Sequence, residues 1–98
     1  MASPAWLAAR ERWHATWIAL FGAEPFCLVC GKPWTLHTGD LHHRTYARLG
    51  REHFTDLVPL CRRPCHEQVH QILDAIPAWR RAGRPAATDA IITRLRRT

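Results

Sequence analysis

The chain has 98 residues, which is enough for one domain and leaves little room for a second hydrophobic core. Hydrophobic residues make up 47% of it, which excludes disorder along most of the length. The formal net charge is +6, and thirteen of the fourteen basic residues are arginine, whose guanidinium matches phosphate oxygens. This excess predicts an anionic polymer as partner; a solvated basic surface in an arginine-biased protein is the alternative.

The N-terminal segment mixes tryptophan with charged side chains and lacks the uninterrupted apolar run of a signal peptide. No stretch approaches the roughly 20 apolar residues that are needed to cross a bilayer. We therefore expect a cytoplasmic protein without membrane contact, a setting in which disulfides are rare. Four cysteines in two close pairs then indicate metal ligands.

The first predicted element is a helix that begins at Ser3-Pro4 and ends near Gly22. Three- and four-residue spacing relates Trp6, Arg10, Trp13, Trp17 and Leu20/Phe21 within it, so we expect the tryptophan face to pack on the domain. Stacking of nucleobases on these rings is the alternative. Further along, residues 34–37 are expected to form a strand, with a turn at 38–40 into a second strand over 41–44.

The second half of the chain predicts a short apolar run and two helices. The apolar run covers residues 56–60 and ends at Cys61. The first helix should cover about 65–76, because apolar residues recur there on one face; these are Val69, Ile72, Leu73 and Ile76. Pro77 and Gly83 interrupt the helical pattern after it. The last helix is expected over 88–96, with Thr88 as N-cap. Its inward-facing residues should be Ile91, Ile92 and Leu95.

The cysteines form two clips, Cys27-x2-Cys30 and Cys61-x3-Cys65, with thirty residues between them. Each clip can offer two thiolates to one tetrahedral ion, and both spacings are typical of structural zinc. A redox Cys-x-x-Cys would leave the second pair unexplained, and free buried thiols are the other alternative. We therefore predict a four-cysteine zinc site whose binding supplies much of the folding free energy.

The histidines form two groups. His42 and His43 are neighbours on a predicted strand, so they point to opposite sides. His66 and His70 are four residues apart on a predicted helix, so they share one face. Cys65 can bind zinc while the adjacent His66, about 100° further round the helix, addresses a second site. A strand histidine and one or two helix histidines can hold a divalent ion with open positions for phosphate oxygens, and the other strand histidine can accept a proton from water.

Several of these strings together resemble the four-cysteine branch of the HNH endonuclease family, over roughly residues 27–70. They are residues 41–46, 49–52 and 56–61, followed by Cys65-His66 and His70. The resemblance implies an α+β fold with a zinc-stapled ββα-metal core and flanking N- and C-terminal helices. It divides the chain into an N-terminal helix over 1–22, a nuclease module over 23–77 and a basic helical tail over 78–98.

The resemblance also implies roles for individual residues. His43 would be the general base, and His42 and His66 would hold one catalytic divalent ion, which is Mg²⁺, Mn²⁺, Ni²⁺, Co²⁺ or Zn²⁺. His70 would be a third ligand or a phosphate contact. Asp56 stands where the family usually has asparagine; its oxygens can still accept backbone N–H bonds and hold the loop that carries His43. Glu52 should anchor the same loop through a backbone N–H or an arginine, and Tyr46 should pack under the site.

The implied activity is hydrolysis of double-stranded DNA through backbone contacts, with nicking as the outcome and low sequence specificity. The candidate phosphate contacts are Arg44, Arg48, Arg80, Arg81, Arg84, Arg94, Arg96 and Arg97. A homodimer or a partner protein would add specificity. Two alternatives are a zinc-dependent nucleic-acid-binding module without catalysis, and a ribonuclease or toxin-like effector on the same fold.

Overall fold

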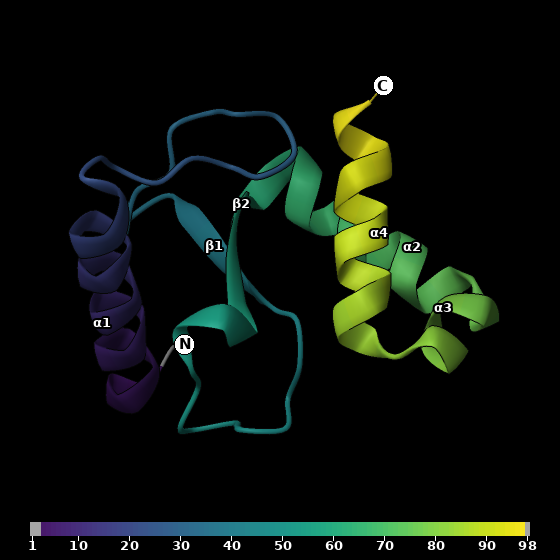
Figure 1. The fold of residues 1–98 in the computed structure, drawn as a ribbon, viewed down its shortest axis with the longest axis horizontal. Helices are drawn as coiled ribbons and strands as arrows, with labels where there is room; N and C mark the ends of the chain where they lie inside the picture. Colours follow the sequence, from purple (N-terminus) through teal and green to yellow (C-terminus); the bar gives the residue numbers. More distant parts are fainter. Residues whose placement is uncertain (1–2, 98) are drawn as a thin grey trace.

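The computed structural model describes residues 3–97; residues 1, 2 and 98, which the expected terminal segments include, lie outside the described residues. The chain is a mixed α+β protein, as predicted, with one antiparallel two-stranded sheet. The helix α1 lies on one side of the sheet and the three C-terminal helices lie on the other (Figure 1). In chain order the elements are α1 (Pro4–Phe21), β1 (Gly39–His43), η1 (Phe54–Asp56), β2 (Leu57–Cys61), η2 (Arg62–His66), α2 (Glu67–Ala75), α3 (Pro77–Ala82) and α4 (Arg84–Arg96).

Helix α1 has the ends that the sequence predicts. The Ser3 hydroxyl accepts a hydrogen bond from the backbone N–H of Trp6 at 3.1 Å, and Pro4 occupies the first turn. Gly22 ends the helix in the left-handed conformation, with φ of 68°. The predicted packing of the tryptophan face is confirmed, since Trp13 is buried against Trp34 on the loop between α1 and β1.

The sheet separates two hydrophobic clusters because successive side chains of a strand point to opposite faces. Leu41 and Leu57 pack with the α1 tryptophans on one face. Leu60 packs with α2 and α4 on the other face. In the register of the sheet, His42 lies opposite Val58 and His43 lies opposite Leu57. The paired histidines of β1 therefore serve different sides of the molecule.

The predicted strand over residues 34–37 is wrong, and so is the turn at 38–40. Residues 36–38 form a turn, and β1 begins at Gly39 and pairs with β2. The reason is Trp34, which is buried among the α1 tryptophans and donates its indole N–H to the Asp40 carbonyl at 2.7 Å. The Trp34 ring packs so closely on Gly39 that a Cβ at this position would collide with it. The chain reaches this contact through the turn at 36–38, and β1 starts directly after it.

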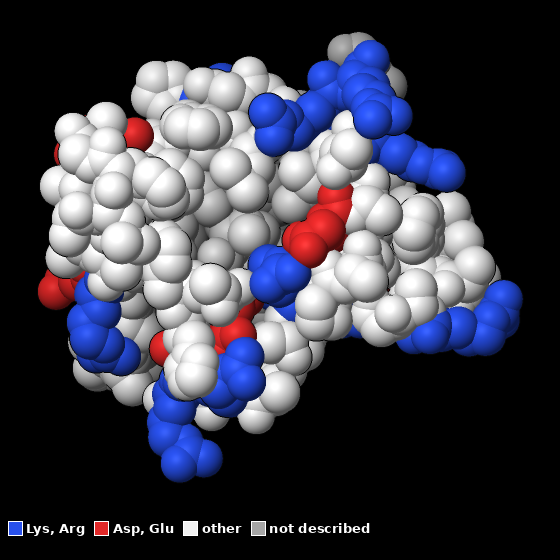
Figure 2. Space-filling view, viewed as in Figure 1, with Lys and Arg blue, Asp and Glu red and all other residues white. Residues whose placement is uncertain are grey.

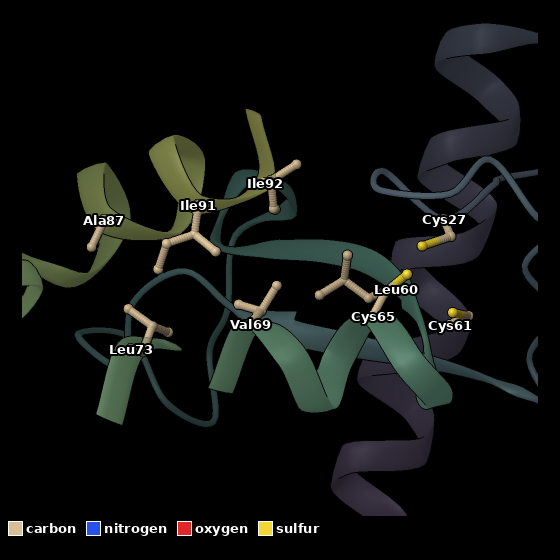
Figure 3. Packing of buried hydrophobic residues seen from close by; sticks show 9 residues of the cluster. All are labelled: Cys27, Leu60, Cys61, Cys65, Val69, Leu73, Ala87, Ile91 and Ile92. Atoms are coloured by element: carbon tan, nitrogen blue, oxygen red, sulfur yellow. The ribbon is translucent and has the colours of Figure 1, made fainter. Parts of the chain in front are cut away.

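The C-terminal helices close the second cluster, in which side chains of α2 and α4 meet those of β2 (Figure 3). The burial predicted for Val69, Leu73, Ile91 and Ile92 is confirmed, and Ile72 and Leu95 are partly buried against them. Ile76 was expected inside but is 44% exposed, because the helix ends at Ala75. The helix expected over 65–76 is divided into η2 and α2.

Thr88 was predicted as an N-cap, which is wrong. Helix α4 begins four residues earlier, at Arg84, with Pro85 in its first turn and Gly83 before it at φ of 91°. Thr88 is therefore inside the helix and fully buried against the sheet. Among the helices described, none combines the length and the apolar character that crossing a lipid bilayer requires.

Candidate metal centres

The four cysteines lie together and form what we call the cysteine cluster. Their Sγ atoms all lie within 4.8 Å of one another, and the Sγ atoms of Cys30 and Cys61 are 3.9 Å apart. Four sulfurs at about 2.3 Å from one tetrahedral ion are about 3.8 Å apart. A disulfide needs about 2.05 Å, and all four cysteines are free. The cluster is therefore compatible with a zinc site.

Local backbone geometry brings the two clips together. The first clip is a tight turn in which the N–H of Gly31 bonds to the carbonyl of Cys27 at 2.9 Å. The N–H of Leu28 bonds to the Pro59 carbonyl at 3.0 Å, which fixes this turn against β2. Cys61 ends β2 and Cys65 lies in η2, so the second clip spans the strand end and the first turn toward α2.

The thiols of the cysteine cluster cannot all ionise without a cation. Burial raises the pKa of Cys65 above its ordinary value, and the neighbouring sulfurs raise it further. Burial alone would also raise the pKa of Cys27, but backbone hydrogen bonds from Cys30, Cys61 and Val29 lower it to about 7. The Cys27 thiolate therefore forms readily, whereas Cys65 requires positive charge nearby to ionise, which is what a thiophilic dication supplies.

Three histidines converge in a second group, the histidine cluster, which consists of His42, His66 and His70. Ring nitrogens of the three lie within 4.8 Å of one another. The ring centroids are 4.8–5.4 Å apart, with the planes steeply inclined. His42 comes from β1, His66 from η2 and His70 from α2. The three residues predicted as ligands are thus brought together, and they could hold a metal ion.

The orientation of two rings supports this fit. The Nε2 of His42 lies 3.1 Å from the Thr88 hydroxyl, and the Nδ1 of His66 lies 2.8 Å from a carboxylate oxygen of Asp40. The remaining nitrogens, His42 Nδ1 and His66 Nε2, are buried and have no hydrogen-bond partner within residues 3–97. A buried polar atom without a partner costs about 1–3 kcal/mol. A cation between the rings would satisfy both atoms.

Electrostatics keeps the histidine cluster in its ligand form. Burial lowers the pKa of His42 to about 2, and the charge of Arg84 acts in the same direction. Burial and His66 lower the pKa of His70. Burial alone would raise the pKa of Asp40, but hydrogen bonds from His66 and Arg62 hold it below its ordinary value. Near neutral pH the cluster therefore offers His42 and His70 as neutral imidazoles, and the charged carboxylate of Asp40 lies behind His66.

The histidine cluster borders a cleft of about 440 Å³ between η2 and α2. Asp40, His66 and His70 line this cleft, together with the η2 arginines Arg62 and Arg63. Arg62 pairs with Asp40 at 3.1 Å and Arg63 pairs with Glu67 at 3.2 Å. Neither arginine was predicted as a site residue, although both belong to the loop between two cysteine ligands.

His43, the predicted base, lies outside the histidine cluster on the α1 side of the sheet. Its Nε2 is 3.0 Å from a carboxylate oxygen of Glu52. Its ring is stacked between Trp6 and Tyr46, with centroids 5.1 Å away on each side. Glu52 was expected to bind a backbone N–H or an arginine; its carboxylate accepts backbone hydrogen bonds at Gly50 and Glu52, and it also contacts the His43 ring. Tyr46, expected to pack underneath, covers one ring face and is 51% exposed.

Asp56 holds the loop in the way that the sequence predicts. It is buried, and one carboxylate oxygen accepts the backbone N–H of His53 at 2.9 Å. The same carboxylate accepts from Arg48, which lowers the pKa of Asp56 to about 2. The Asp56 carbonyl accepts the N–H of Arg44 at 2.7 Å, which extends the sheet beyond His43. Asp56 thereby fixes the backbone on both sides of the loop between the strands.

Among residues 3–97, four of the eight predicted phosphate contacts donate hydrogen bonds to other parts of the chain; these are Arg44, Arg48, Arg80 and Arg84. Arg44 pairs with Asp89 at 2.6 Å, and Arg48 pairs with Asp56. Arg84 donates to the His43 carbonyl at 2.8 Å and to the Tyr46 hydroxyl at 3.2 Å. Figure 2 shows basic side chains gathered near the ends of α3 and α4. The exposed arginines on α3 and α4 are Arg80, Arg81, Arg94 and Arg96, and Arg97, which is also exposed, directly follows α4.

Two residues that contact the histidine cluster were missed. Asp40 had a signal, since it lies two residues before His42 and so shares its face of the strand. Thr88 had none, because it meets His42 from 46 residues further along the chain.

Comparison of the chain with protein-family models, with curated proteins and with solved structures found no match.

Proposed function

We propose that this protein is a metal-dependent endonuclease of the HNH type that hydrolyses phosphodiester bonds of DNA. The cysteine cluster would hold structural zinc, and the histidine cluster would hold one catalytic divalent ion within a ββα-metal core. One observation carries the proposal. Three imidazoles from separate elements converge on one point, and the residue next to one of them, His43, is paired with a carboxylate.

The histidine cluster would supply the electrophilic part of the reaction. When bound, a divalent cation neutralises charge on the phosphoryl oxygens and stabilises the leaving alkoxide. His42, His66 and His70 offer three neutral nitrogen ligands and leave coordination positions open. Imidazole ligands suit Zn²⁺, Ni²⁺, Co²⁺ or Mn²⁺, and Mg²⁺ is used by carboxylate-rich sites more often.

His43 would accept the proton of the attacking water. Its hydrogen bond to Glu52 holds the proton on Nε2 and leaves the lone pair on Nδ1. Stacking between Trp6 and Tyr46 fixes the plane of the ring. A histidine positioned in this way contributes about 10²–10⁴-fold to the rate of hydrolysis.

The edge of β1 that faces away from β2 is where the scissile phosphate would bind. The backbone N–H of Arg44 donates to the Asp56 carbonyl. Hydrogen-bonded and non-hydrogen-bonded pairs alternate along an antiparallel sheet, so the backbone N–H and C=O of His43 point away from β2. Arg84 reaches this edge and bonds the His43 carbonyl, and its charge also lowers the pKa of His42 and His70. Arg84 thus lies within electrostatic reach of both histidine groups. The exposed arginines of α3 and α4 would add backbone contacts without reading sequence.

A plasmid-nicking assay tests the proposal. Supercoiled DNA would be incubated with the protein and Mg²⁺, Mn²⁺, Ni²⁺ or Co²⁺, and His43→Ala would be compared with His37→Ala, an exposed histidine elsewhere. We expect nicking by the wild type and by His37→Ala, and a loss of about 10²–10⁴-fold for His43→Ala with unchanged metal content and DNA affinity.

The outcomes separate the alternatives. DNA binding without cleavage at any metal would support the non-catalytic nucleic-acid-binding module. Cleavage of RNA in preference to DNA in a parallel assay would support the ribonuclease. Unchanged nicking by His43→Ala would overturn the assignment of the base.

A further inference from the structure

We infer that His42 and His66 bind the catalytic ion through different ring nitrogens, His42 through Nδ1 and His66 through Nε2. Thr88 and Asp40 are the positioning residues that impose this difference, because each occupies the opposite nitrogen of one ring. The inference rests on the proposed function of the histidine cluster as a metal site, and it adds how the site is built and what keeps it in place.

The Asp40 side chain determines which nitrogen of His66 is free. An ionised carboxylate can only accept hydrogen bonds, so the His66 Nδ1 at 2.8 Å must carry the proton. In a neutral imidazole the other nitrogen, Nε2, then carries the lone pair. That atom is buried and unpartnered within the described chain. The carboxylate is itself fixed, because its second oxygen accepts from Arg62 Nε at 3.1 Å.

The Thr88 hydroxyl determines which nitrogen of His42 is free. It lies 3.1 Å from Nε2, so an ion at that nitrogen would have to displace it. The Nδ1 atom of His42 is buried and has no hydrogen-bond partner in the part of the chain that is described. The His42 ring contacts the rings of His66 and His70. A hydroxyl can accept as well as donate, so Thr88 can receive the Nε2 proton when Nδ1 holds a cation.

The two supports differ in strength, and they come from different parts of the chain. The Asp40–His66 hydrogen bond is charge-assisted and makes His66 a more basic metal ligand than His42. Thr88 offers His42 only a neutral hydrogen-bond acceptor. Asp40 lies on β1, but Thr88 lies on α4, to which the sequence analysis assigned no part in the metal site. Helix α4 therefore completes the metal site from behind, in addition to any contact with DNA.

The ring nitrogens can be observed directly. In protein labelled with ¹⁵N-histidine and loaded with Zn²⁺ at both clusters, long-range ¹H–¹⁵N NMR spectra distinguish metal-bound Nδ1 from metal-bound Nε2. We expect zinc on Nδ1 of His42 and on Nε2 of His66. Coordination of His42 through Nε2, or of His66 through Nδ1, would overturn the inference.

Variants test the positioning role through metal affinity, measured by competition with a chromophoric chelator. Thr88→Val keeps the shape and removes the hydroxyl, and Asp40→Asn removes the charge. We expect each to weaken the second ion about 10–100-fold, with Thr88→Ser close to wild type. The matched controls are Thr93→Val, also on α4, and Glu24→Gln, a carboxylate that pairs with His14 away from the cluster; neither should change the affinity.

The failures are distinguishable. If wild-type protein binds one ion per chain, in the cysteine cluster alone, the proposed function fails. If a second ion binds in the histidine cluster but Thr88→Val and Asp40→Asn keep wild-type affinity, the inference alone fails. Should Thr88→Val not fold, Asp40→Asn and the wild-type NMR spectra still decide it.

Discussion

The cysteine cluster and the histidine cluster both combine a strand residue with a residue of η2, but different side chains surround them. The cysteine cluster offers four thiols, of which those of Cys27, Cys61 and Cys65 are buried. The histidine cluster offers three nitrogens, borders a cleft, and has a carboxylate and a hydroxyl behind its rings.

Under the proposed function, this difference would separate a site that holds the fold from a site that can exchange ligands. Four protein ligands fill a tetrahedral ion and leave nothing open, whereas three ligands leave positions for water or phosphate. Loss of an ion should therefore have unequal consequences at the two clusters: unfolding at one and loss of activity at the other. Substitutions within the clusters and away from them test this inequality.

The largest effect is expected for Cys65→Ser. Zinc binding at such sites supplies on the order of 10 kcal/mol, as much as the whole stability of a small domain. We expect the variant to lose bound zinc and its cooperative unfolding transition, measured by metal analysis and by thermal denaturation followed by circular dichroism. A variant that stays folded without zinc would contradict the structural role of the cysteine cluster.

A smaller effect on folding is expected for His66→Ala, with a large effect on activity. The substitution removes a ligand of the histidine cluster and leaves the cysteine cluster intact. We expect one zinc per chain, a thermal midpoint within a few degrees of wild type and no plasmid nicking. If His66→Ala unfolded the protein as Cys65→Ser does, the two clusters would not differ in the way described.

A moderate, pH-dependent effect is expected at Asp56, which contacts neither cluster. The bond with Arg48 lowers the pKa of Asp56 to about 2, below its value of about 3.9 in unfolded chains. The folded state is therefore favoured above pH 4, and this contribution is lost as the pH falls from about 4 to 2. In Asp56→Asn the free energy of unfolding should depend less on pH over that window. At pH 7 it should be about 1.5–3 kcal/mol lower than in the wild type. Denaturant titrations at several pH values measure both; an unchanged acid limb would contradict the role of Arg48.

The smallest effect is expected for Arg81→Gln on α3. Its side chain is exposed and distant in sequence from both clusters. As one phosphate contact it should reduce the salt dependence of DNA binding by about one unit of slope, without altering metal content or thermal midpoint. Affinity measured across salt concentrations checks this. An identical slope would remove Arg81 from the DNA-binding surface.

Local spacing explains why much of this molecule could be predicted from sequence. The Ser3-Pro4 start and the Gly22 end of α1 depend on neighbouring residues only. The clips of the cysteine cluster and the pairing of His66 with His70 are also short-range patterns. Such patterns name the candidate ligands well before the fold is known.

Tertiary packing explains the rest. The expected strand at 34–37 was wrong because Trp34 is buried against α1, an event that no local pattern encodes. Thr88 resembles an N-cap by residue type, yet Pro85 starts the helix earlier and the Thr88 side chain is used by His42. The pairing of His43 with Glu52 likewise depends on how the loop after β1 returns to the sheet.

Cys65 and His66 are joined by a single peptide bond, yet they belong to different clusters. Inserting one residue between them would turn the following ring by about 100° and separate the two sites. Under the proposed function, loss of zinc from the cysteine cluster would therefore also displace His66. The histidine cluster would then bind no manganese, nickel or magnesium, at any concentration of those ions.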